Sequence, residues 1–139
     1  DVFYKVGLMD ESYFLYYEEM DFCLQVHKGG WECWFVPESR VLHLEGQSTG
    51  VNNKSIAPRR RPKYWFESRR RYFVKNFGKL HAMTADIVWL LGMLTWKLRN
   101  IIQRKESKYP PHFFMDACVN SVLFQGFDIK KTQNKLETE

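Results

Sequence analysis

The sequence predicts an α/β part over residues 1–50 followed by an α-helical extension, and three observations lead to this. Strand-like and helix-like patterns alternate in the first fifty residues, as in α/β architectures. Apolar residues spaced three and four apart dominate after residue 62. The net charge also changes sign between the two parts of the chain. Residues 1–50 carry three basic and nine acidic residues, a net charge of −6, whereas residues 51–139 carry eighteen basic and seven acidic, a net charge of +11.

The first part is expected to contain one short helix between short strands. Residues 2–8 alternate like a strand, and residues 31–36 and 40–44 are two further strand candidates. The helix is predicted over 18–28, because acids fill its first turn, apolar residues recur at spacings of three and four, and two glycines follow it. A Gly-containing loop then runs to residue 50.

The second part is predicted to be a linker, a helical region and a polar tail. The linker is 51–62, the helical and basic extension is 63–125, and the tail is 126–139. Within the extension, helices are expected over 63–77, closed by Gly78, over 80–104, and over 112–124. On the first of these, aromatic residues should form the apolar side and Arg69, Arg70 and Arg71 the solvent side. The expected apolar stripe of the second helix is Ile87, Leu90, Leu91, Leu94, Leu98, Ile101 and Ile102, widened by Trp89, Met93 and Trp96.

Composition excludes several classes of protein. A chain of 139 residues with 45% hydrophobic and 17% aromatic content buries a core, which argues against wholesale disorder, collagen-like repetition and a small disulfide scaffold. Three scattered cysteines support neither a disulfide framework nor a zinc knuckle, and they fit a reducing compartment. A metal set of Cys23, His27 and Cys33 lacks a fourth ligand. The chain opens on Asp1 inside an apolar run, so we expect it to be a piece of a longer protein.

Carboxylates gather at the start of the predicted helix over 18–28. Glu18, Glu19 and Asp21 lie within four residues, so they can raise one another's pKa and supply a general base. The alternative is that these acids only stabilise the helix N-terminus. His43, at the end of a strand candidate, is a possible metal ligand, although a single histidine is more often packed or solvated.

Two arginine triplets, 59–61 and 69–71, are interleaved with aromatic residues. Guanidinium groups bind phosphates through charge-assisted hydrogen bonds, so nucleic acid, an anionic membrane surface and a diphosphate ligand all fit, as does a merely solvated face. The neighbouring helix over 80–104 favours a membrane surface, because it combines two tryptophans with a basic end. Its longest apolar stretch, 87–96, is half of the roughly 20 residues that span a bilayer, so an interfacial helix or a core helix is expected instead. Nucleic acid is the less favoured partner, because it leaves the acidic first part unexplained. The alternative function is a non-catalytic module, either a basic one that binds nucleic acid or an anionic membrane, or a structural or adaptor domain.

An ordered series of short motifs resembles a known family. The residues that carry the resemblance are Gly7 to Leu24, Gly30-Trp31, Val36-Pro37-Glu38, Val41-Leu42-His43 and Gly46-Gln47-Ser48-Thr49. They resemble the C-terminal half of the catalytic domain of family 2 glycosyltransferases, nearest to bacterial rhamnosyltransferase-like members that build cell-surface polysaccharides on lipid carriers. Residues 61–73 resemble the C-terminal extension of the same proteins.

The resemblance implies a GT-A (Rossmann-like) fold and an inverting transfer of a sugar from a nucleotide-sugar donor to a hydroxyl of a lipid-linked or other glycan acceptor. It also implies a divalent metal, Mg²⁺ or Mn²⁺, on the donor diphosphate, and a cytoplasmic location on the inner face of the cell membrane. Glu19 takes the place of the family's general base, with a Glu where an Asp is common, and His43 that of a metal ligand. Other roles follow from the same resemblance: Asp21 and Glu18 beside the base, Trp31 near the acceptor, Gln47, Ser48 and Thr49 near the donor diphosphate, and Arg59, Arg60 and Arg61 on lipid phosphates.

The resemblance covers only the acceptor side of such a domain. The family's nucleotide-binding strands and its Asp-x-Asp metal motif lie N-terminal to the matched region, and nothing in residues 1–139 replaces them. We therefore expect the chain on its own neither to bind a nucleotide sugar tightly nor to turn over.

Overall fold

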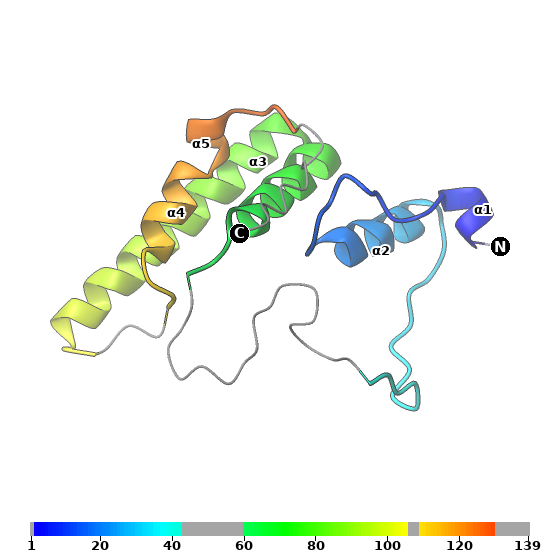
Figure 1. Ribbon diagram of the computed structural model, residues 1–139, viewed down its shortest axis with the longest axis horizontal. Coiled ribbons are helices and arrows are strands. Elements are labelled where there is room, and N and C mark those ends of the chain that lie inside the picture. Colours follow the sequence, from blue (N-terminus) through cyan, green and yellow to red (C-terminus); the bar gives the residue numbers. More distant parts are fainter. Residues whose placement is uncertain (1, 43–59, 106–108, 130–139) are drawn as a thin grey trace, which may run out of the picture.

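The computed structural model describes residues 2–42, 60–105 and 109–129, and these residues form helices and loops. The helices are α1 (Val2–Val6), α2 (Glu18–Lys28), α3 (Lys63–Ile102), α4 (Phe113–Val119) and α5 (Val122–Gln125). Figure 1 shows α1 and α2 at one side of a bundle that α3, α4 and α5 form. None of the described residues is in a strand. An α/β domain remains a proposal, because a sheet needs several strands and the described residues supply none.

The strand expected over residues 2–8 is wrong, because α1 occupies most of it. A strand without a neighbour leaves its backbone groups unpaired, whereas one helical turn pairs them locally. Gly7 closes this turn: its N–H donates to the carbonyl of Phe3 at 3.1 Å, and its φ of 93° favours glycine. Residues 31–36 and 40–42 have no regular structure, so the strand over 31–36 is also wrong, and residues 43 and 44 lie outside the described residues.

Helix α2 has the bounds that the sequence predicts. Acidic side chains occupy its first turn, and Gly29 and Gly30 end it, with Gly30 at a φ of 81°. Gly29 also permits close packing, because a Cβ there would lie 3.1 Å from a methyl group of Val6. The rings of Phe3 and Phe22 stack with centroids 5.4 Å apart, so α1 is attached to α2 through side chains as well.

Helix α3 is a hairpin of two helical arms, 63–77 and 79–102, joined at Gly78. Gly78 has φ 79° and ψ 177°, a conformation that only glycine adopts readily, and the chain reverses there (Figure 1). Side chains on facing turns of the two arms meet, as the 6.2 Å separation of the Trp65 and Trp89 ring centroids shows. The sequence prediction of two helices separated at Gly78 is therefore confirmed.

The core lies between the two arms of α3 and α4. Its buried members are Phe66, Met93, Phe113 and Ala117, and Trp65, Trp89, Leu90 and Phe114 pack against them partly buried. Two of the three residues that widen the predicted stripe of the second arm, Trp89 and Met93, thus face inward. Most of the stripe itself faces outward, since Ile87, Leu91, Leu94, Leu98, Ile101 and Ile102 are all exposed, and we call these six residues the outer apolar face.

A buried ion pair fastens the hairpin and the C-terminal helices together. Arg69 donates to Asp86 across the two arms, and both side chains are almost fully buried. The other carboxylate oxygen of Asp86 accepts the N–H of Val122, the first residue of α5, at 2.7 Å. The expected helix over 112–124 is therefore two short helices, α4 and α5, with the break next to this contact. Among residues 2–42, 60–105 and 109–129, no helix combines the length and apolarity that crossing a membrane requires.

Candidate active site

The three carboxylates singled out by the sequence lie on the first turn of α2, where they have different surroundings. Glu19 is exposed, Glu18 is half-buried, and Asp21 is 2% exposed. Successive helical residues point in different directions, so one turn presents one carboxylate to solvent and another to the protein interior. The structure therefore separates an accessible acid from a structural one.

Of the three carboxylates at the start of α2, Glu18 has a clearly shifted pKa. Burial raises its pKa, and the neighbouring Glu19 carboxyl raises it further. One oxygen of Glu18, Oε2, is buried without a hydrogen-bond partner. Glu19, by contrast, is exposed, so its carboxyl is the member of the pair that a substrate can reach. Such a pair suits a general base that faces solvent.

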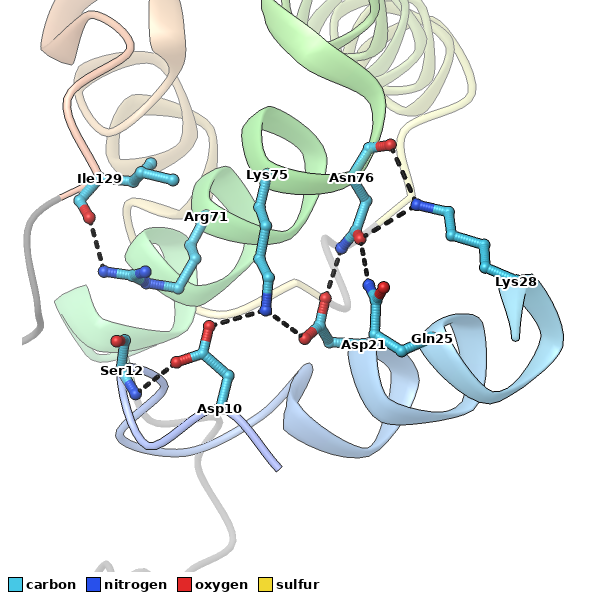
Figure 2. Close-up of polar contacts among 9 residues, drawn as sticks. All are labelled: Asp10, Ser12, Asp21, Gln25, Lys28, Arg71, Lys75, Asn76 and Ile129. Atoms are coloured by element: carbon cyan, nitrogen blue, oxygen red, sulfur yellow. Dashed lines mark hydrogen bonds and ion pairs between the residues drawn. The ribbon is translucent and has the colours of Figure 1, made fainter. Parts of the chain in front are cut away.

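Asp21 is held by the first arm of α3, as Figure 2 shows. Lys75 donates to it at 2.7 Å and Asn76 donates to it at 2.5 Å. The same lysine reaches Asp10 at 2.7 Å, so one ammonium group ties the loop before α2 and α2 itself to α3. Gln25, one turn further along α2, donates to Asn76 at 2.7 Å. We call Asp10, Asp21, Lys75 and Asn76 the polar clamp.

The entry to α2 is backbone in an unusual conformation. Tyr16 and Tyr17 both have positive φ, 69° and 70°, which costs about 1–3 kcal/mol per residue and persists only where the surroundings enforce it. The enforcing contacts are aromatic: Tyr16 stacks on Tyr64 at 6.3 Å, and Tyr17 lies 5.5 Å from Tyr72. Glu18 and Glu19 are thus positioned by a strained loop that the first arm of α3 holds in place.

Acid should weaken the polar clamp in a defined pH range. Although burial alone would raise it, hydrogen bonds from Lys75 and Ser12 lower the pKa of Asp10 from 3.8 to about 2. A lowered folded-state pKa stabilises the fold above the ordinary value, and this contribution disappears as pH falls from about 4 to about 2. Asp10→Asn is expected to cost about 1 kcal/mol at pH 7, because solvent screens a partly exposed pair, and nothing near pH 2. Urea unfolding at several pH values measures this, with the exposed neighbour Glu11→Gln as control. Equal acid dependence in Asp10→Asn and the parent would contradict it.

The other predicted site residues do not gather at the carboxylates. Trp31 lies past the opposite end of the 11-residue α2, about 16 Å along the helix axis, and Lys5 sits over its ring at 5.3 Å. Arg60 makes a two-point ion pair with Asp116 of α4, at 2.6 and 2.9 Å, and Arg61 is exposed beside Trp65. The remaining predicted residues lie outside the described residues, namely His43, Gln47, Ser48, Thr49 and Arg59.

The second arginine triplet is not the solvent-facing row that the sequence predicts. Arg69 and Arg71 are buried: Arg69 pairs with Asp86, and Arg71 donates to the carbonyl of Ile129 at 2.6 Å. Arg69 also lies 4.1 Å from the Trp89 ring centroid, so its charge is stabilised inside the bundle. Sequence reasoning also misses Lys75 and Asn76 as partners of the carboxylates. The available signal was a lysine and an asparagine side by side on a helix otherwise rich in aromatic residues and arginine.

Comparison with known proteins gives one short similarity. Over 48 residues the chain is 44% identical to proteins named N-acetylglucosaminyl-diphospho-decaprenol L-rhamnosyltransferase from two strains of Mycobacterium tuberculosis, CDC 1551/Oshkosh and ATCC 25618/H37Rv. The match covers 34% of this chain and only 16% of the length of each of those proteins. No family model matches the chain, and no solved structure does. The similarity indicates a glycosyltransferase-like role.

Proposed function

We propose that the chain is the acceptor side of an inverting family 2 glycosyltransferase of GT-A fold. The observation that carries this proposal is the pair of a half-buried Glu18 and an exposed Glu19 at the start of a helix whose entry is strained and clamped. The 48-residue similarity to a rhamnosyltransferase supports it independently. The substrates proposed for the whole protein are a nucleotide-sugar donor and a lipid-linked glycan acceptor.

In the proposed reaction, Glu19 accepts the proton of the acceptor hydroxyl as that oxygen attacks the anomeric carbon. The bond to the donor diphosphate breaks on the opposite face, so the anomeric configuration inverts and the nucleotide diphosphate leaves. Glu18, whose pKa is raised by burial, lies beside Glu19 on the same turn of α2. Asp21 touches no reacting atom in this scheme; it positions the turn that carries Glu19 through Lys75 and Asn76.

The divalent cation is proposed only for the whole protein. The described residues contain no group of three His, Cys, Asp or Glu side chains that is able to hold a metal. His43, the residue proposed to bind Mg²⁺ or Mn²⁺, lies outside the described residues. The roles proposed for Glu18, Glu19 and Asp21 do not depend on this metal.

Stereochemistry tests the proposed reaction. The whole protein, supplied with a panel of nucleotide sugars and a lipid-linked acceptor, is expected to form a glycosylated lipid whose new bond has the opposite anomeric configuration to the donor. NMR of the product distinguishes the two configurations through the one-bond coupling between the anomeric carbon and its proton. Retention of configuration would rule out Glu19 as the base of a single displacement, and hydrolysis without transfer would rule out the acceptor role.

A lipid-linked acceptor requires contact with a membrane, and we propose that the outer apolar face of α3 makes it from the cytoplasmic side. This face is next to Lys97 and Arg99, which favour anionic headgroups. Arg69 and Arg71 are buried and cannot contact lipid headgroups. The membrane contact is therefore proposed for the second arm of α3 and for Arg61.

Liposome flotation tests this contact. The chain is expected to float with vesicles that contain anionic lipid, and Leu91→Asp with Leu98→Asp is expected to abolish flotation, because two charges on the outer apolar face oppose insertion. Ser39→Asp with Gln125→Asp, both exposed and both outside α3, is the matched control for added charge. Failure of the parent chain to float with either anionic or neutral vesicles would contradict the proposal.

A further inference from the structure

A cavity of about 490 Å³ opens at the far end of the second arm of α3, where it faces the segment that leads into α4. None of its lining residues belongs to the polar clamp or to the carboxylate pair. The cavity is therefore a separate feature, and the mechanism above leaves it unused.

Aromatic rings form firm apolar walls. Trp96 and Tyr109 meet edge to face with centroids 4.5 Å apart, and Tyr109 stacks on Phe113 at 5.3 Å. Phe113 in turn belongs to the buried core. Because the rings lock one another against the core, the walls are preformed, and their flat faces suit a flexible hydrocarbon chain.

The rim of the cavity is cationic. Lys97, Arg104 and Lys105 line it, and none of the lining residues in the described part of the chain is acidic. The acid next to this region, Asp116, is already paired with Arg60. A cluster of this kind attracts an anion, and the apolar walls beside it require that the anion be attached to something apolar.

A buried donor without a partner lies in the same wall. Asn100 lines the cavity, and its side-chain amide nitrogen, Nδ2, is buried and makes no hydrogen bond. Buried polar groups are nearly always paired, since an unpaired one loses its interaction with water without compensation. An oxygen acceptor supplied by a bound ligand would satisfy this donor.

We infer that this cavity binds a single-chain amphiphile with an anionic, phosphate-type head. The chain lies against Trp96, Tyr109 and Phe113, and the head lies at the basic rim, where an oxygen accepts from Asn100. Ile101 lines the cavity and is 65% exposed on the outer apolar face, so the cavity opens toward that face. This inference does not depend on glycosyl transfer.

Binding of three probes to the 139-residue chain tests the inference. Decyl phosphate below its micellar concentration, decanol and inorganic phosphate are titrated while tryptophan fluorescence is followed. Decyl phosphate is expected to bind saturably and at least tenfold more tightly than either other probe. Equal binding of inorganic phosphate would reduce the feature to a free-anion site, and equal binding of decanol would reduce it to an unselective apolar surface; either result overturns the inference.

Two variants locate the binding. Asn100→Leu is expected to lose most of the preference for decyl phosphate over decanol, while Tm stays the same or rises, because an unpaired buried donor is removed. Lys105→Glu is expected to weaken decyl phosphate binding at least fivefold. Arg99→Glu is the matched control, since Arg99 is exposed near the end of α3 but does not line the cavity. Equal weakening in Lys105→Glu and Arg99→Glu, or full selectivity in Asn100→Leu, would overturn the inference.

Discussion

Replacing Asp86 with alanine is expected to lower the free energy of unfolding by about 3–5 kcal/mol, the usual cost of removing one partner from a buried ion pair. Asp86 is 1% exposed and accepts from both Arg69 and the backbone of Val122. Its loss leaves a buried guanidinium and a buried N–H unpaired at once. A domain is typically stable by only about 5–15 kcal/mol, so this change approaches unfolding.

Urea unfolding followed by circular dichroism measures the effect. The control is Glu67→Ala, which removes the partly exposed pair of Lys63 and Glu67, 3.1 Å apart on the first arm, and is expected to cost less than about 1 kcal/mol. Replacing both partners, Arg69→Met with Asp86→Leu, should recover part of the loss, because no buried charge is then left alone. If Asp86→Ala were as stable as Glu67→Ala, the pair would not be what fastens the hairpin to α5.

Replacing Glu19 with glutamine in the whole protein is expected to lower kcat by about 10²–10⁴-fold, the usual contribution of a general base. KM for the acceptor should change little, because the glutamine has the same shape and the lost interaction is the proton transfer itself. Glu19 is exposed, so stability should change by less than about 0.5 kcal/mol, which separates a catalytic loss from a folding loss.

Glu18→Gln is the matched control on the adjacent residue. Because burial raises the pKa of Glu18, the folded state holds this proton at pH values where the unfolded chain has released it. The parent therefore loses stability as pH rises from the ordinary glutamate value through the raised one, and Glu18→Gln should lack this loss. We expect Glu18→Gln to keep far more activity than Glu19→Gln. The reverse order would make Glu18 the base.

Local signals predicted α2 and the break at Gly78. Acids in a first turn, glycines after a last turn and a single glycine between two periodic segments act within a few residues, so the sequence displays them directly. The strand over residues 2–8 could not be judged in that way, because its formation depends on a neighbouring strand. Alternation over seven residues does not reveal whether such a neighbour is present.

The sequence pattern could not predict contacts between residues that are distant in the chain. Asp21 and Lys75 are separated by 54 residues, and neither has a neighbour that indicates the other. The burial of Arg69 was unpredictable for a related reason. A triplet of arginines normally indicates a solvated helix face. The buried charge of Arg69 is stabilised by Asp86 and Trp89, which both come from the other arm of α3.

The sequence also does not show which face of the second arm of α3 is buried. Apolar residues nearly encircle this helix, so periodicity does not tell which face meets the core. The structure places Trp89 and Met93 inward and leaves Leu91 and Leu98 outward. The outward face is what makes a membrane surface worth testing.

We propose that Glu19 deprotonates the acceptor in a sugar transfer. The most direct measurement is the rate of transfer by the whole protein and by its Glu19→Gln variant, at saturating donor and acceptor, with acceptor affinity measured separately. We expect a rate at least 100-fold lower in the variant with unchanged acceptor affinity. A rate within threefold of the parent would contradict it.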